Sequence, residues 1–197
     1  ASHLNTISTI LFYNSPVITN STFRGNPTWQ WSASAVNGGT GTHLTVDNCV
    51  FSSFHTYYWG GAIHIWAYDA TITNSLFLDN SAGEIGDGRG GAIAIYDPAG
   101  AASTKNVTVT NCTFFGNQAN PNLMGGSPGG AIHNRYQTLT VTNSIFWNND
   151  NLDIYRESGT ATISYSDIDG GLAGTNFTDG GGNIDSDPLF ANTAGDP

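Results

Sequence analysis

The chain has 197 residues, enough for one large domain or one elongated array of repeats. Only 10% of the residues are charged, and 5 Lys+Arg stand against 15 Asp+Glu, which gives a formal net charge of −10. Such an acidic surface repels phosphate backbones and anionic lipids, so we expect no nucleic-acid partner. No apolar run approaches the roughly 20 residues of a spanning helix, so we expect no membrane span. Low Lys content and abundant Gly, Asn, Thr and Ser favour an extracellular or cell-surface location.

The chain repeats one short motif. In chain order its copies read ITNSTFRGN, VDNCVFSSF, ITNSLFLDN, VTNCTFFGN and VTNSIFWNN, followed by a degenerate ISYSDIDGG at residues 163–171. The motif Gly-Gly-Ala-Ile (GGAI) precedes three of the copies, at residues 60–63, 90–93 and 129–132. Intervals between copies vary from 22 to 37 residues. Such variation is typical of a solenoid in which each unit forms one coil and loops of different length bulge outward.

The hydrophobic period within a unit is two, which predicts β-strands. In the segment GGAIHIW, Ile63 and Ile65 fall on one side of a strand, and His64 and Trp66 on the other. Gly interrupts the chain throughout, and no segment carries a sustained stripe with the 3.6-residue period of a helix. We therefore predict an all-β solenoid that forms a single domain over residues 1–197.

Stacked coils place equivalent residues of successive units above one another, about 4.8 Å apart. The motif's aromatic position should therefore form a ring stack in the core, made of Phe23, Phe51, Phe77, Phe114 and Phe146. Its asparagines should form an amide ladder at a corner between strands, made of Asn20, Asn48, Asn74, Asn111 and Asn143. The paired glycines are expected at tight turns with positive φ. Because its positions have these structural roles, the motif is predicted to be a structural repeat and not a catalytic signature.

The two cysteines occupy the repeat position where other units carry Ser. The coil of Ser75 separates Cys49 from Cys112, so their spacing should be about twice 4.8 Å. A disulfide needs Cα atoms within about 7 Å. We therefore predict two buried free thiols that act as small core residues.

These motifs resemble the polymorphic outer-membrane-protein type repeats of right-handed parallel β-helix surface proteins. The matching pieces are the three GGAI segments and Phe-x-x-Asn at residues 23–26, 77–80, 114–117 and 146–149; Phe51 departs from the pattern because Phe54 replaces the Asn. Residues 160–190 resemble the terminal coils of secreted bacterial β-helix proteins. The resemblance implies a right-handed parallel β-helix of about six to seven coils. It implies no activity, because such repeats occur in adhesins, surface stalks and uncharacterised secreted proteins.

Many parallel β-helix proteins degrade polysaccharides, and such enzymes need a carboxylate pair or Ca²⁺ with a strong base. The pieces Gly-His-Gly and Arg-Ile-Lys of polygalacturonase-like enzymes are absent, and the basic residues do not recur at one repeat position. We therefore expect no catalytic residue and no enzyme. A polysaccharide lyase or glycoside hydrolase is the enzyme alternative.

Acidic residues gather toward the C-terminal part of the chain. The segments SDIDGG and NIDSDP have the Asp-x-Asp spacing that offers oxygens to Ca²⁺, but neither completes a calcium loop. We expect these carboxylates to cap turns, and hence no metal or other cofactor. A Ca²⁺ site is the alternative, with the candidate ligands Asp167, Asp169, Asp185 and Asp187.

Several aromatic residues and two histidines are expected on the outside. His64 and His133 both follow GGAI, with Ala94 between them in the stack, so we predict solvent-facing histidines too far apart to share a metal. Exposed aromatic patches mark protein interfaces or sugar platforms, of which we favour an interface. The candidates are Trp29, Trp31, Trp59, Trp66, Trp147, Tyr57 and Tyr58, with Tyr68 and Tyr96 in the same group.

Four Asn-x-Ser/Thr sequons mark candidate glycosylation sites. Asn106 and Asn176 fall in predicted loops and could carry glycan. Asn20 and Asn111 belong to the predicted ladder, so we expect them to be inaccessible.

The ends of the solenoid carry the functional prediction. Residues 6–23 already contain a strand, a corner and a core Phe without a capping helix, and residues 187–197 stop after the strand-like PLF. Bare strand edges and a start at Ala1 suggest either an excised segment of a longer β-helix or subunits that stack head to tail into fibres. We therefore predict a secreted structural protein, a subunit or segment of a surface filament or stalk that self-associates through both ends. A glycan-binding adhesin module is the first alternative.

Overall fold

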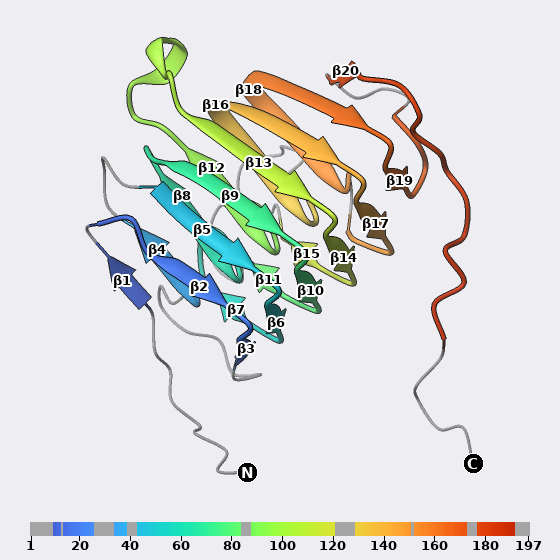
Figure 1. Ribbon diagram of the computed structural model, residues 1–197, viewed down its shortest axis with the longest axis horizontal. Helices are drawn as coiled ribbons and strands as arrows, with labels where there is room; N and C mark the ends of the chain where they lie inside the picture. Colours follow the sequence, from blue (N-terminus) through green and yellow to red (C-terminus); the bar gives the residue numbers. More distant parts are fainter. Residues whose placement is uncertain are drawn as a thin grey trace.

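The chain, seen in a computed structural model, is a stack of coils built almost entirely from short β-strands. The structure describes residues 10–12, 14–25, 34–38, 43–83, 88–120, 129–150, 152–172 and 177–191. Successive coils follow one another along one axis, from β1 to β20 (Figure 1). All strand pairs among these residues are parallel, which confirms the predicted parallel solenoid. Within the same residues no helix is long and apolar enough to cross a membrane.

The coils present three long faces. The first, here called the GGAI sheet, comprises β1 (Ile10–Phe12), β4 (Val36–Gly38), β8 (Ile63–Trp66), β12 (Ile93–Tyr96) and the first halves of β16 (Ile132–Thr142) and β18 (Ile154–Ser164). The second, the threonine sheet, comprises β2 (Val17–Thr19), β5 (His43–Asp47), β9 (Asp69–Thr73), β13 (Asn106–Thr110), the second halves of β16 and β18, and β20 (Thr178–Asp179). Because β16 and β18 continue through the corner, these two faces join into one 11-stranded sheet.

The third face, the phenylalanine sheet, has six strands. They are β3 (Thr22–Arg24), β6 (Val50–Ser52), β10 (Leu76–Leu78), β14 (Thr113–Phe115), β17 (Ile145–Trp147) and β19 (Asp167–Ile168). A smaller three-stranded sheet follows it, made of β7 (His55–Thr56), β11 (Ser81–Ala82) and β15 (Gln118–Ala119). One 3-10 turn, η1 (Gly100–Ala102), lies in the loop before β13.

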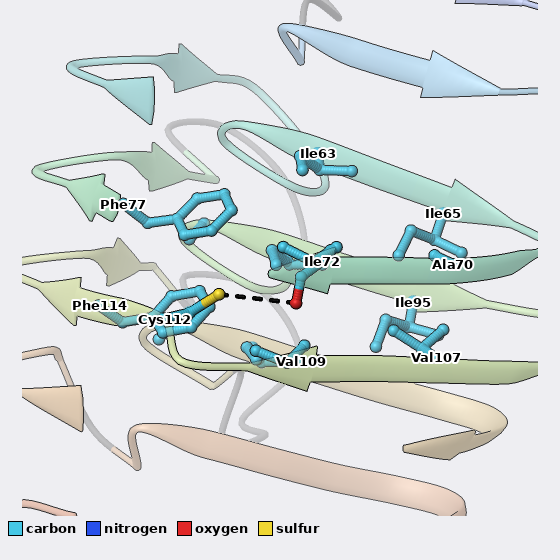
Figure 2. Close-up of a cluster of buried hydrophobic side chains, with 14 of the residues drawn as sticks. Ile63, Ile65, Ala70, Ile72, Phe77, Ile95, Val107, Val109, Cys112 and Phe114 are labelled. Carbon is cyan, nitrogen blue, oxygen red and sulfur yellow. Dashed lines mark hydrogen bonds between the residues drawn. The ribbon is translucent and has the colours of Figure 1, made fainter. Parts of the chain in front are cut away.

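The strand register reproduces the sequence repeat. Phe77 pairs with Phe51 on one side and Phe114 on the other, so equivalent motif residues lie directly above one another. The alternating residues point inward from all three faces and fill the space between them, as Figure 2 shows for Ile63, Ile72 and Phe77. The two-residue period of the sequence therefore sets which side chain of each strand enters the core.

The predicted core rings form one continuous stack. Neighbouring rings of Phe23, Phe51, Phe77, Phe114 and Phe146 have centroids 4.8, 5.1, 4.6 and 4.5 Å apart, and their planes differ by no more than 8°. Coil spacing imposes this near-parallel arrangement, because each ring lies one strand separation from the next.

The corner asparagines adopt the left-handed backbone conformation that the motif needs. φ lies between 50° and 55° at the five corner positions, Asn20, Asn48, Asn74, Asn111 and Asn143. Asn is among the few residues that tolerate this conformation, which turns the chain from the threonine sheet into the phenylalanine sheet. The first glycine of each GGAI motif has φ of 60–66°, and a side chain on the second would meet the backbone of the next coil. Both glycines are therefore required by the turn.

The cysteines are buried and free, as predicted. The Sγ atom of Cys112 donates to the carbonyl oxygens of Thr110 at 3.3 Å and Ile72 at 3.7 Å, the latter shown in Figure 2. Burial raises the pKa of the Cys112 thiol to about 11, so it stays protonated and unreactive at neutral pH. In another coil, Ser75 uses its hydroxyl in the same way, donating to Thr73 at 2.7 Å. This shared bond explains why Ser and Cys alternate at one repeat position.

The segment after β19 differs from the bare edge predicted at this end. Leu172 and Phe177 pack against the hydrophobic core, so the last coils are partly covered. The predicted strand at PLF is wrong: residues 188–190 form no strand, and the ring of Phe190 lies edge-on against Phe115, with centroids 5.4 Å apart. The segment therefore folds back along the outside of the phenylalanine sheet (Figure 1).

Candidate functional site

A patch of aromatic and charged side chains covers the outer face of the GGAI sheet. Its position follows from register: Trp66 pairs with Tyr96, which pairs with Arg135, and His64, Ala94 and His133 form the adjacent row. We call this the aromatic–arginine patch, made of Trp59, His64, Trp66, Arg89, Tyr96, His133, Arg135, Tyr136 and Glu157. Residues from four successive coils thus meet on one surface.

The aromatic half of the patch is a rigid cluster. The rings of Trp59 and Trp66 stack with centroids 6.4 Å apart and planes 24° from parallel. Tyr96 contacts both edge-on, at 5.3 Å from Trp59 and 4.8 Å from Trp66. Trp66 remains 37% exposed. The cluster therefore offers a fixed indole surface to solvent.

The charged half centres on one carboxylate. Glu157 forms ion pairs with Arg89 and with Nε of Arg135 at 3.0 Å, and lies 3.2 Å from Nε2 of His133. The guanidinium of Arg89 also lies over the ring of Trp59 at 5.3 Å, and that of Arg135 over Tyr96 at 5.5 Å. The two halves are therefore joined by cation–π contacts.

Hydrogen bonding and charge keep Glu157 ionised. The His133 hydrogen bond, followed by the charges of Arg89 and Arg135, lowers the pKa of Glu157 to about 2. A carboxylate with so low a pKa is a weak base at neutral pH. Its main effect is to hold the two guanidinium groups in place.

The histidines are not solvent-facing, so that prediction is wrong. Both side chains project from the outer side of the sheet, but His133 is only 3% exposed. The ring of His64 packs edge-on against Trp59 and Trp66, with centroids 5.7 and 5.6 Å away. Burial lowers the pKa of His64 to about 4, so its imidazole is neutral at pH 7. Large side chains on neighbouring coils cover the histidines. Strand alternation predicts which side of the sheet a residue faces, but not whether its neighbours bury it.

The other predicted aromatic residues are spread over the molecule. Trp147 lies on the outside of the phenylalanine sheet, paired with Phe115. Tyr57 and Tyr58 lie in the bend before Trp59, where Tyr58 is 46% exposed, whereas Tyr68 is fully buried. Trp29 and Trp31 lie outside the described residues.

The predicted corner ladder is continuous only in part. Asn48 donates to Oδ1 of Asn20 at 2.7 Å, and Asn111 to Oδ1 of Asn74 at 3.2 Å. Between these pairs, Asn74 donates to Asp47 at 2.7 Å. The row lies on the outside of the corner, so Asn20 and Asn111 are exposed, and the expected inaccessibility of these sequons is wrong. Asn106 is exposed too, but it begins β13, so its predicted place in a loop is wrong. Asn176 lies outside the described residues.

A second asparagine row, missed in the sequence analysis, lies inside the next corner. The amide of Asn80 donates to Oδ1 of Asn117 at 2.9 Å, and Asn117 donates to Oδ1 of Asn149 at the same distance. Asn80 and Asn117 are fully buried. The Phe-x-x-Asn spacing was the available signal, because its Asn recurs at the same place in four copies of the motif.

The four candidate calcium ligands act as caps of turns. The carboxylate oxygens of Asp169 and Asp187 accept backbone N–H bonds from Asn148 at 3.2 Å and Leu189 at 2.9 Å. Those of Asp167 and Asp185 accept from Ser186 at 3.0 Å and Gly170 at 3.2 Å. In the part of the chain that the structure describes, no three His, Cys, Asp or Glu side chains are grouped to hold a metal ion. A bound Ca²⁺ stays the alternative.

Comparison with known proteins supports the fold. Residues 5–134 match a family model described as "Right handed beta helix region". No curated protein and no solved structure matches the chain.

Proposed function

The chain belongs to the right-handed β-helix family, and we propose that it is a glycan-binding module of an extracellular or cell-surface protein. The solenoid provides a rigid repeat scaffold, and the aromatic–arginine patch provides the binding surface. Family membership alone is compatible with structural, adhesive and enzymatic roles, so the proposal rests on the patch.

The observation that carries the proposal is the exposed Trp66 ring beside fixed hydrogen-bond donors. A sugar ring has an apolar face, which stacks on an indole, and a rim of hydroxyl groups, which need donors and acceptors. Trp59 and Tyr96 hold the Trp66 ring in place. Arg89 and Arg135 place guanidinium groups next to these rings. A protein interface would use the rings equally well, but the adjoining arginines favour a polyhydroxylated ligand.

The same patch favours binding over catalysis. Glycoside hydrolysis needs two carboxylates, one of which has a raised pKa. Glu157 is the carboxylate of the patch, and its pKa is lowered to about 2. We therefore propose a non-catalytic role.

Head-to-tail assembly into a filament stays a prediction. Leu172 and Phe177 pack over the core beyond β18, where a stacking partner would have to pair. A covered core end offers less apolar surface to a second copy.

The proposal is tested by screening the protein on an array of oligosaccharides and measuring the affinity for any hit by calorimetry. We expect Trp66→Ala to weaken binding roughly tenfold, since stacking on an aromatic ring contributes about 1 kcal/mol or more. Trp147→Ala is the matched control, because it removes the same side chain from another face. Absence of any glycan ligand, or equal loss in both variants, would contradict the proposal.

A further inference from the structure

The outer face of the threonine sheet carries two rows of side chains, all of them hydroxyl-bearing except Asp47. Strand register aligns the first row across six coils: Thr45, Thr71, Thr108, Thr140, Thr162 and Thr178. It aligns the second row two residues further along each strand: Thr19, Asp47, Thr73, Thr110, Thr142 and Ser164. We call these two rows the hydroxyl face. It shares no residue with the aromatic–arginine patch.

The hydroxyl face is a two-dimensional grid. Neighbouring strands set a repeat of about 4.8 Å along each row, and two residues of extended strand set a separation of about 6.7 Å between rows. The strands that carry the rows lie side by side along the stack in Figure 1. Between the rows, one residue of each strand enters the core, as Ile72, Val109 and Val141 do, each with no exposed surface. The grid is therefore anchored on residues of the buried core.

The hydroxyl groups keep bonding capacity for an outside partner. Thr108 donates to the carbonyl oxygen of Ala70 at 3.4 Å, and the hydroxyls of Thr142 and Ser164 lie 3.3 Å apart. A hydroxyl has one donor and two acceptor sites, so one internal bond leaves sites free. The stiff χ1 angle of Thr keeps its methyl and hydroxyl groups in fixed positions.

Charge on this face fits an uncharged occupant. In a chain with a net charge of −10, the two rows hold one ionised residue, Asp47, whose carboxylate is occupied by Thr73 and Asn74 at 2.7 Å each. The two rows contain no aromatic side chain, and stacking rings are what a crystalline polysaccharide would need. The matching occupant is therefore neutral, flat and periodic, and both donates and accepts hydrogen bonds.

We propose that the hydroxyl face binds ice. Water molecules on a prism face of hexagonal ice form a neutral grid of donors and acceptors whose two repeats are close to those of the Thr rows. Ordered waters bound between the rows would continue that lattice, with the Thr methyl groups filling the spaces between them. This activity is independent of the proposed glycan binding, because it uses another face.

The test is the partitioning of the protein into ice grown slowly from a dilute solution on a cold finger. We expect the wild-type protein to be enriched in the ice fraction. Thr108→Tyr and, separately, Thr140→Tyr should lower the ice fraction to that of a protein excluded from ice, since a large ring in the rows prevents flat contact. Thr113→Tyr is the matched control: Thr113 lies in the same coil as Thr108, on the outside of the phenylalanine sheet, so this variant should partition like wild type.

Unchanged circular dichroism and thermal midpoint show that each variant is folded. Exclusion of the folded wild-type protein from ice would overturn the proposal. Equal partitioning of Thr108→Tyr and Thr113→Tyr would also overturn it, because another face would then be responsible. Wild-type adsorption to crystalline cellulose or chitin that is lost in Thr108→Tyr, without ice enrichment, would assign the face to a polysaccharide instead.

Discussion

The two asparagine rows use the same side chain for different purposes. The corner row, at Asn111 and its equivalents, is exposed and turns the chain with φ near 50°, and its amide bonds are interrupted at Asp47. In the inner row, Asn80 and Asn117 are buried, and each is bonded to the coils on both sides. Asn117, for example, accepts from the backbone N–H and the amide of Asn80 at 3.1 and 2.9 Å, and donates to Phe77 and Asn149 at 3.0 and 2.9 Å.

The corner row therefore contributes mainly through its backbone conformation, and the inner row through its hydrogen bonds. At the corner, water can replace a lost amide bond, so the residue is needed chiefly for its backbone conformation. In the buried inner row, water cannot replace a lost amide bond, so these hydrogen bonds themselves hold adjacent coils together.

The largest effect is expected from breaking the inner row. Asn117→Ala removes the acceptor of Asn80 and the donor to Phe77 in a fully buried place. Each buried group left without a partner costs about 1–3 kcal/mol, so the free energy of unfolding should fall by roughly 3 kcal/mol. Urea unfolding measures it. A loss no larger than that of Asn111→Ala would show that the two rows are equivalent.

The inner row ends on a carboxyl group whose titration can be isolated. Asn149 donates to Oδ1 of Asp153 at 2.8 Å, and Asp153 is 6% exposed. Burial raises the pKa of Asp153 from 3.8 to about 7, with the charges of Asp169 and Asp185 adding to the shift. The folded state therefore holds a proton that the unfolded state releases near pH 4. This contribution to stability is complete below pH 4 and is lost as pH rises through 7.

Asp153→Asn should therefore stabilise the protein at pH 8 by about 2 kcal/mol relative to wild type, with little difference at pH 4. His64 acts in the opposite direction, since its pKa is lowered to about 4 and its contribution grows as pH rises from 4 to 6.5. His64 is present in both the variant and the wild type, so its contribution cancels when their free energies of unfolding are compared. Urea unfolding at pH 4, 6 and 8 measures the difference, and a difference that does not change with pH would contradict the assignment to Asp153.

The smallest effect is expected at the corner. Asn111→Ala places an ordinary residue at φ 55°, which should cost about 1 kcal/mol, whereas Asn111→Gly should be nearly neutral because Gly adopts this conformation freely. Thermal unfolding of the two variants checks the order. If Gly is as destabilising as Ala, the exposed amide bond to Asn74 is the important contribution and the two rows are more alike than the structure indicates.

Much of the fold could be predicted from the sequence because the repeat is local. The two-residue period and the recurrence of Phe77 and its equivalents determine strands, coil register and ring stack without knowledge of loops. The burial of the inner asparagines was missed for a physical reason. Residues at a corner do not alternate as residues in a strand do, so the motif alone does not show which of Asn74 and Asn80 turns inward.

The aromatic–arginine patch was harder to predict because its members do not repeat. Arg89 and Glu157 lie 68 residues apart and come from different parts of their coils, so no spacing relates them. Trp66 and Tyr96 could be placed side by side by register, but the arginines over the rings could not.

By itself, the sequence determined an all-β solenoid with a Phe core, free buried cysteines and corners at Asn, because each follows from a period or from the preference of one residue type. The tertiary structure alone decided which asparagines are buried, that His133 is covered, and that Arg89, Arg135 and Glu157 meet. The physical reason is that stacking brings into contact residues that are a coil or more apart in the chain, while loops of unequal length hide that relation from any fixed spacing.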